Sequence, residues 1–516
     1  MIGRTPRGRK LFMSPAPDPG TAPDSIALSS RVAHGVMWMG GGRIVVRLLG
    51  FVSTLILARL LLPADFGVVA LATSVIAILE LLTSFTFEIA LIQKADLARS
   101  HLDTVWTLTL LFNTVIAALL LLLAAPAAHF YREPRLEPVL YALSLNQIIS
   151  GFANIGTVYF RRQLNFSKDF ILQVSTKVAG FLTTVPLAFV LRNYWALVLG
   201  MLVANLATTT VSYVMHSYRP RLSLSAWREL LGFSVWLLLN NFFTFLRNRS
   251  ADLIIGRLLG AYSVGVFSLS YEIASLPTTE GVAAINRVVF PAYIKVGQDE
   301  HALQQAFANV LSVIAVIMLP LTVGIASVAG LAVAFLLGDR WTAAGPIVAA
   351  LAIYSALSCL QTNTGPVYNA LGKPRIILVT GVIHLTTLVP LLVAVASTRR
   401  VEFVAWAFTL HAAVIGFPTT YILFVRHTPV RFAAVIGAIW RPTVAAAVMY
   451  LAVHATLSSS AQVHGMSPGA QLAAAVAVGG ATYAGLIAAL WWTTGSSQSA
   501  EARLWKWALS RGKSPL

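Results

Sequence analysis

Apolar residues in this chain are grouped into long blocks that short polar segments separate. A helix needs about 20 predominantly apolar residues to cross the hydrocarbon core of a bilayer. From Gly35 onward, fourteen blocks reach that length: residues 35–61, 66–92, 104–128, 137–160, 170–191, 194–216, 229–259, 264–290, 303–325, 343–371, 375–397, 402–426, 437–458 and 469–493. The pattern predicts an all-α polytopic membrane protein with about 14 transmembrane helices.

The composition agrees with this interpretation and excludes a soluble enzyme. Of the 516 residues, 57% are hydrophobic and 11% are charged, whereas a soluble domain has about 25% charged residues. Cys359 is the only cysteine, which excludes a disulfide framework and a cysteine-based metal site. The chain is therefore held together by helix packing.

Positively charged residues are distributed unevenly over the predicted loops. With both termini in the cytoplasm, 23 of the 37 Lys and Arg residues fall on the cytoplasmic side, 6 in outer loops and 8 at membrane depth. The positive-inside rule favours this orientation and an even number of spans. It also explains most of the net charge of +18, and no nucleic-acid-binding module is recognisable. Residues 1–30 and 496–516 are expected to be basic cytoplasmic tails, the first of them disordered.

An internal repeat predicts two lobes. Residues 58–68 and 256–266 share five of eleven positions at one constant offset. We therefore expect an N-lobe of six helices over residues 31–228, a C-lobe of six helices over 229–430, and two extra helices over 431–495. Parallel lobes of this kind are typical of transporters, with the substrate site between the lobes near the membrane midplane.

Arginines at membrane depth are the first candidates for a binding site. Arg43 and Arg47 share one face of the first span, and Arg247 and Arg249 lie in its repeat mate, the seventh. Together they predict a cationic cleft that binds phosphate oxygens. For each of them, anchoring in the headgroup region or internal pairing is the alternative. Arg249 and Asp252 have the i, i+3 spacing of an ion pair, and Arg59 and Arg257 are expected to lie at helix ends near the membrane interface.

Acidic residues at membrane depth are candidates for ion coupling. They are Glu80, Glu88, Asp252, Glu272 and Glu280. A buried carboxylate can bind a proton or coordinate Na⁺, or it can form an internal salt bridge. The sequence leaves both interpretations open, except that for Glu280 the structural one is favoured. For His384 and His411, packing within the membrane is favoured over a proton relay.

Five segments carry a resemblance to a known family. They match turns and helix exits in the expected order: Leu57 to Gly67, Ala90 to Gln93, Arg287 to Tyr293, Gly338 to Trp341 and Ala370 to Pro374. Over about residues 31 to 455 the chain resembles polysaccharide flippases of the Wzx type, in the branch with colanic-acid exporters of the multidrug/oligosaccharidyl-lipid/polysaccharide (MOP) exporter superfamily.

The resemblance implies a function. A member of this family flips undecaprenyl-pyrophosphate-linked oligosaccharide repeat units across the bacterial inner membrane for exopolysaccharide, capsule or O-antigen biosynthesis. Its partners would be this lipid-linked oligosaccharide, membrane lipid, a polysaccharide polymerase and a chain-length regulator. No catalytic residue, cofactor or metal is expected, and coupling to H⁺ or Na⁺ is left open, since Asp252 alone resembles part of a sodium site.

Three alternatives remain beside this interpretation. A lipid II flippase has a similar fold and a similar pyrophosphate substrate. A cation-coupled multidrug antiporter of the same superfamily would need an acidic or neutral site, which the arginines disfavour. A membrane-embedded enzyme would need a large outer loop with catalytic residues, and the longest predicted outer loops have only about ten residues.

Overall fold

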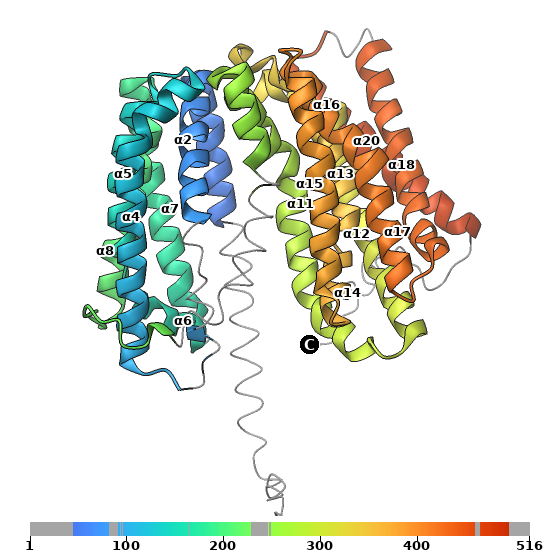
Figure 1. Ribbon diagram of the computed structural model, residues 1–516. Helices are drawn as coiled ribbons and strands as arrows, with labels where there is room; N and C mark the ends of the chain where they lie inside the picture. Colours follow the sequence, from blue (N-terminus) through green and yellow to red (C-terminus); the bar gives the residue numbers. More distant parts are fainter. Residues whose placement is uncertain are drawn as a thin grey trace, which may run out of the picture.

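The computed structural model describes an all-helical protein (Figure 1). The described residues are 45–81, 91–92, 94, 96–163, 165–228, 246, 249–459 and 465–494. Within them no strand occurs, and each of the fourteen predicted spans contains a helix. The two predicted tails lie outside the described residues.

The first half of the chain forms a group of helices at the left of Figure 1. After a helix over residues 45–60, the elements are α2 (Pro63–Leu81), α4 (Arg99–Tyr131), α5 (Leu136–Gly151), η1 (Ile155–Thr157), α6 (Val158–Arg162), α7 (Phe166–Leu191) and α8 (Trp195–Met215). Within this group α4 packs on α5, and α7 packs on α8.

The second half forms the group at the right of Figure 1. After a helix over residues 249–259, the elements are α11 (Ala261–Val296), α12 (Glu300–Leu337), η2 (Asp339–Trp341), α13 (Ala344–Gln361), α14 (Thr364–Ala370), α15 (Pro374–Ala396), α16 (Val401–His411), the π-helix η3 (Ala412–Gly416), α17 (Phe417–His427), α18 (Phe432–Ser459) and α20 (Pro468–Thr494). The last two helices pack on α12.

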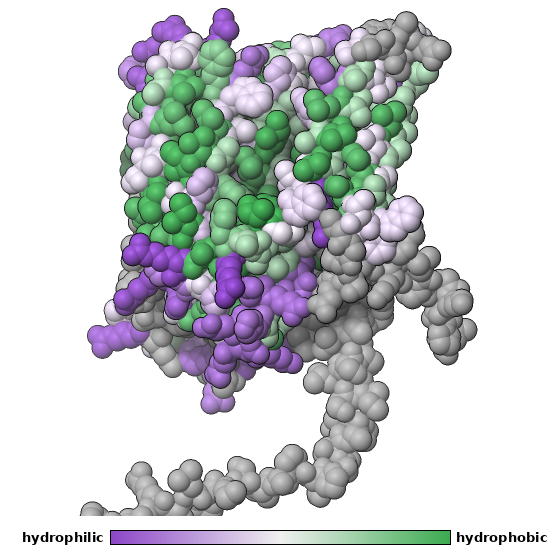
Figure 2. All heavy atoms as spheres, turned by 90° about the vertical axis from the view of Figure 1, so that its right-hand side faces the viewer, coloured by the Kyte–Doolittle hydropathy of each residue, from purple (hydrophilic) through white to green (hydrophobic). Residues whose placement is uncertain are grey.

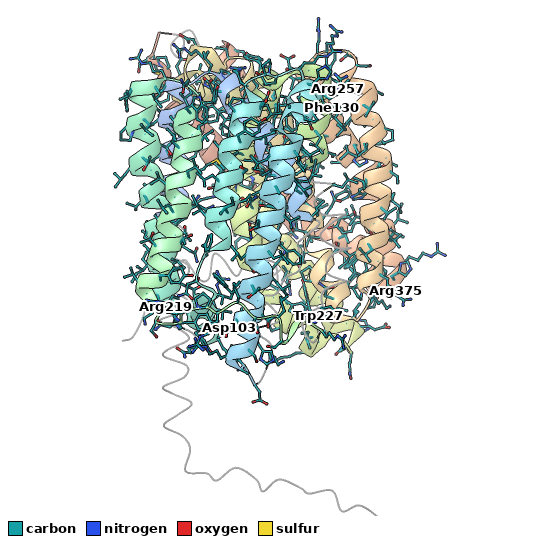
Figure 3. All side chains as sticks on the ribbon, turned by 60° about the vertical axis from the view of Figure 1, so that its left-hand side comes forward. Asp103, Phe130, Arg219, Trp227, Arg257 and Arg375 are labelled. Atoms are coloured by element: carbon teal, nitrogen blue, oxygen red, sulfur yellow. The ribbon has the colours of Figure 1, made fainter. Side chains whose placement is uncertain are left out.

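The surface has the layering of a membrane protein. In the described part of the chain, ten helices are long and apolar enough to span a bilayer. Figure 2 shows apolar side chains across the middle of one face and hydrophilic side chains gathered at both ends. Arg257 and Phe130 lie at one end and Asp103 and Arg219 at the other (Figure 3). We refer to these as the predicted outer end and the predicted cytoplasmic end, after the charge distribution.

One predicted boundary is wrong. The ninth span was expected over residues 303–325, but α12 continues to Leu337, because residues 326–337 remain apolar. The helix stops at Gly338, whose φ of 89° a residue with a side chain rarely adopts. At about 1.5 Å per residue, α12 is longer than the hydrocarbon core is thick.

The two groups of helices meet at the predicted outer end, where α2 packs against α11. A Cβ atom on Gly67 would lie 1.7 Å from the Ala261 carbonyl oxygen, and one on Gly265 would lie 1.8 Å from the Pro63 carbonyl oxygen. These positions are equivalent in the internal repeat. The reciprocal contact is therefore what an axis between two repeats produces, and only glycine permits such close approach of the backbones.

A second set of contacts joins the groups at the same end. The Trp341 indole donates a hydrogen bond to the Ala58 carbonyl at 2.6 Å, and its ring meets Phe66 edge to face. The Arg59 guanidinium donates to the Leu336 carbonyl at 2.9 Å and also to the Phe335 carbonyl. Arg59 thus binds the C-terminal carbonyls of α12, where a cation is favourable, rather than the end of its own helix.

Candidate substrate site

Arg47 is a predicted site residue whose side chain reaches from the first group of helices to the second. It lies in the helix over residues 45–60, about 20 Å from the outer end of that helix at 1.5 Å per residue. Its Nη2 atom donates a hydrogen bond to the Thr279 hydroxyl of α11 at 3.2 Å. Arg47 as a whole is half-buried. This places a permanent positive charge at the boundary between the groups, in the predicted cytoplasmic half of the membrane.

Arg249 and Asp252 form the ion pair that their spacing predicted. Arg249 Nη1 donates to Asp252 Oδ2 at 3.1 Å. The Ser268 hydroxyl of α11 donates to Asp252 Oδ1 at 3.1 Å, and the Ser74 hydroxyl of α2 donates to Oδ2 at 3.4 Å. Asp252 is only 7% exposed. Its carboxylate is therefore satisfied by partners from both groups of helices, as a buried charge requires.

Two other acidic candidates differ in their surroundings. Glu80 of α2 accepts a hydrogen bond from the Gln147 amide of α5 at 2.9 Å. Glu272 of α11 is exposed, and the described residues provide no ion pair for it. Neither arrangement by itself assigns a coupling ion. Among the described residues no group of three metal-ligating side chains comes together.

The remaining charged candidates lie either outside the described residues or away from the boundary between the two groups of helices. Arg43, Glu88 and Arg247 lie outside the described residues, as does the side chain of Glu280. Arg257 lies at the predicted outer end with its guanidinium over the Phe130 ring, 5.0 Å from the centroid (Figure 3). This is a cation–π contact, and it borders a pocket of about 750 Å³.

A polar cavity of about 590 Å³ lies within the second group of helices. On α11 it is lined by Ser275, Thr278, Thr279, Val282 and Asn286, whose spacing places them on one helix face. On α15 the lining residues Ile377, Thr380, Gly381, His384 and Leu388 follow the same spacing. Because Thr279 belongs to the lining, Arg47 stands at the edge of this cavity.

Hydrogen bonds join side chains of α13, α15, α16 and α17 in the cavity wall. Thr420 donates to Gln361 Oε1 at 2.9 Å and lies 3.4 Å from His384 Nε2. His411 Nε2 lies 2.8 Å from the Thr387 hydroxyl, and the two imidazole rings are 5.9 Å apart. His411 is 5% exposed. The contacts agree with the packing interpretation of both histidines.

Sequence reasoning missed this cavity because it searched for charges, and the cavity is lined by uncharged polar groups. Two signals were present. Ser275, Thr278 and Thr279 form a polar stripe on a span, and residues 361–364 (Gln-Thr-Asn-Thr) interrupt an apolar block. In the structure that run ends α13 and begins α14.

Comparison with known sequences identifies relatives. Residues 56–346 match the family described as polysaccharide biosynthesis protein. The chain is 25% identical over 353 residues to the lipopolysaccharide biosynthesis protein WzxC of Escherichia coli, covering 67% of this chain and 71% of that protein. It is 25% identical over 442 residues to the succinoglycan biosynthesis transport protein ExoT of Rhizobium meliloti, covering 85% and 89%.

Comparison with solved structures identifies the fold. The lipid II flippase MurJ in an inward closed conformation superposes with a TM-score of 0.68 at 13% identity, covering 89% of this chain and all of that one. An inward-facing multidrug transporter of the MOP superfamily gives a TM-score of 0.56 at 15% identity, covering 74% and 95%. The predicted fold is confirmed: this multi-pass membrane protein has the MOP fold and belongs to the polysaccharide biosynthesis protein family.

Proposed function

We propose that the chain flips undecaprenyl-pyrophosphate-linked oligosaccharide repeat units across the bacterial inner membrane, for the assembly of a surface polysaccharide. Family membership supports a role in polysaccharide biosynthesis. The names of ExoT and MurJ state transport and flipping, which supports a transporter rather than an enzyme. A lipid II flippase and a multidrug antiporter are the competing functions.

The observation that carries the proposal is the position of Arg47. A pyrophosphate needs a cation that remains charged in a membrane setting, and the fork of a guanidinium matches its oxygens. Arg47 presents this group between the two groups of helices, beside a polar cavity. A site for cationic drugs would place a carboxylate there instead, so Arg47 favours an anionic substrate.

The contacts at the predicted outer end suggest how transport proceeds. The helices α2 and α11 are in backbone contact at that end. With both termini in the cytoplasm, this conformation is closed toward the outside, and the substrate enters from the cytoplasmic leaflet. Separation of α2 from α11 then exposes the site to the outside, which is alternating access. The coupling ion of this step is H⁺ or Na⁺, with Asp252 as its candidate ligand beside its structural role.

The proposal is tested by depleting the chain in its native host and analysing the lipid extract by mass spectrometry. We expect one complete polyprenyl-pyrophosphate oligosaccharide to accumulate, wild-type chain to clear it, and Arg47→Ala (R47A) to leave it in place at an equal protein level. R47K keeps the charge but loses the fork, and we expect it to clear the lipid partially.

Two outcomes would contradict the proposal. Accumulation of lipid II in place of the oligosaccharide would show that the chain is a lipid II flippase. No accumulation of either lipid, together with normal surface polysaccharide, would favour the drug antiporter.

A further inference from the structure

We infer that the polar cavity beside Arg47 receives the sugar residues of the substrate, while Arg47 holds the pyrophosphate at the cavity edge. This inference rests on the proposed function and adds a binding site for the carbohydrate. The first group of helices would then bind the pyrophosphate through Arg47, and the second group would bind the sugars in its cavity.

The chemistry of the lining selects the ligand class. Hydroxyl, amide, phenol and imidazole groups line the cavity together with apolar side chains such as Val282, Ile377 and Leu388, and none of the described lining residues has a carboxylate, an ammonium or a guanidinium group. Such groups both donate and accept hydrogen bonds, which is what sugar hydroxyls require. Without a fixed charge the wall suits neither a metal cation nor a phosphate, and an acyl chain would leave its polar groups unsatisfied.

Two polar atoms in the wall lack a partner. The Tyr368 hydroxyl and Asn286 Oδ1 are buried, and no described residue forms a hydrogen bond with either. Tyr368 as a whole is only 2% exposed. A buried polar atom without a partner costs about 1–3 kcal/mol. Because both atoms are enclosed by the wall, a ligand hydroxyl would bond to them only after a shift of the lining side chains, and that bond would recover this energy.

The size and the aromatic residues also fit a sugar. A volume of about 590 Å³ lies within the usual range for small-molecule sites. Tyr271 and Tyr354 line the cavity with ring centroids 6.3 Å apart. Their rings offer apolar area for the C–H faces of a pyranose.

Glycines in the lining allow the cavity to be filled without disturbing the fold. A Cβ atom on Gly381 of α15 would meet no atom within 4 Å, so G381L extends a side chain into open space. Gly480 of α20 is also free of neighbours within 4 Å and lies outside the cavity lining. Both substitutions remove a helical glycine, which improves helix propensity by about 1 kcal/mol. G480L is therefore the matched control.

The experiment measures equilibrium binding to the purified full chain in nanodiscs with two probes. One is undecaprenyl pyrophosphate, and the other is the lipid-linked oligosaccharide extracted from polymerase-deficient cells of the native host. We expect wild type and G480L to bind the oligosaccharide lipid at least tenfold more tightly than undecaprenyl pyrophosphate. In G381L this preference disappears while affinity for undecaprenyl pyrophosphate stays the same, and R47A weakens binding of both probes.

Tyr368→Phe provides a second variant that does not depend on filling the cavity. Loss of one hydrogen bond is expected to weaken binding of the oligosaccharide lipid about fivefold. Thermal stability of the free protein should stay equal or rise, because the hydroxyl has no partner among the described residues. A purely structural role for this hydroxyl would lower the stability and leave the affinity unchanged.

The outcomes separate this inference from the proposed function. If wild type binds both probes equally, or if G381L keeps the tenfold preference, the sugar site is refuted and the flippase proposal stands. If wild type binds neither probe, the proposed function fails with it.

Discussion

At the scale of single residues, the hydrogen-bond and ion-pair partners of Asp252 explain its structural role. Asp252 accepts hydrogen bonds from Arg249, Ser268 and Ser74, so its carboxylate joins three helices. The i, i+3 spacing was enough to predict the partnership with Arg249. The two serines were not predictable, because only the folded chain brings α2 and α11 to the same carboxylate.

D252A should lower the stability of the protein by about 2 kcal/mol, since it leaves the Arg249 cation without its partner. R249A combined with D252A should recover part of this loss, because no unpaired charge remains. Thermal unfolding in detergent measures both variants, and additive losses would show that the pair is not coupled.

D252N separates structure from ion coupling. The amide keeps the shape of the side chain, its oxygen can accept a hydrogen bond from one of the two serines, and its NH2 group can donate to the hydroxyl of the other. If Asp252 binds the coupling ion, D252N loses transport driven by an H⁺ or Na⁺ gradient, with a smaller fall in melting temperature than D252A causes. Gradient-driven transport equal to wild type would remove Asp252 as the ion ligand.

His216, just after α8, makes the predicted cytoplasmic end sensitive to pH. Its Nδ1 atom accepts a hydrogen bond from the Tyr218 backbone amide at 3.1 Å, and its ring stacks on Tyr159. Burial, with Lys168 and Arg219 nearby, lowers the pKa of His216 below its usual 6.5. The neutral imidazole is therefore the form that the fold requires.

The pH dependence follows from this direction. The unfolded segment binds a proton at about pH 6.5 and the folded segment only at lower pH, so stability is complete above 6.5 and falls as the pH is lowered. Hydrogen exchange of residues 216–228, corrected for intrinsic rates, should be faster at pH 5.5 than at pH 7.5. Asn at position 216 should abolish that difference, and an unchanged difference in H216N would assign it to another group.

At the scale of elements, the repeat predicts more than helix number. The equivalent positions Gly67 and Gly265 lie in one reciprocal contact between α2 and α11. The repeat itself was visible in the sequence, but the contact was not, because a glycine in an apolar block gives no indication of its neighbour. The far end of α12 was missed for a similar reason, since apolarity alone does not mark where a helix leaves the membrane.

G67V should separate α2 from α11, because its side chain would overlap the Ala261 backbone. Spin labels at the exposed positions 62 and 262 report this distance directly. Cys359 is buried and need not be removed. We expect a single short distance in wild type and longer distances in G67V.

G437V in α18 is the control for this variant, since no atom lies within 4 Å of a Cβ atom at Gly437. It should keep the wild-type distance. A wild-type distance in G67V as well would show that the glycine contact does not hold the predicted outer end closed.

At the scale of the whole molecule, the fold and the family could be predicted from the sequence, whereas the arrangement of the substrate site could be predicted only in part. The all-helical fold class and the family follow from hydrophobic blocks and ordered motifs, and the structure and the relatives confirm them. The arrangement of the site, with Arg47 in the first group of helices and the cavity in the second, does not follow from these patterns. Arg47 was recognisable as a costly charge at membrane depth, whereas the cavity beside it is formed by α11 and by the helices from α13 to α17, which meet only in the fold.

The central claim is that this chain moves a lipid-linked oligosaccharide between leaflets with Arg47 on its pyrophosphate. The most direct test reconstitutes the purified full chain in liposomes that contain the extracted oligosaccharide lipid, and follows the accessibility of its sugar to an added lectin over time. We predict that wild type exchanges the lipid between leaflets well above the rate in protein-free liposomes, and that R47A does not. A rate equal to that of protein-free liposomes for wild type, with folded protein shown in the same vesicles, would contradict the claim.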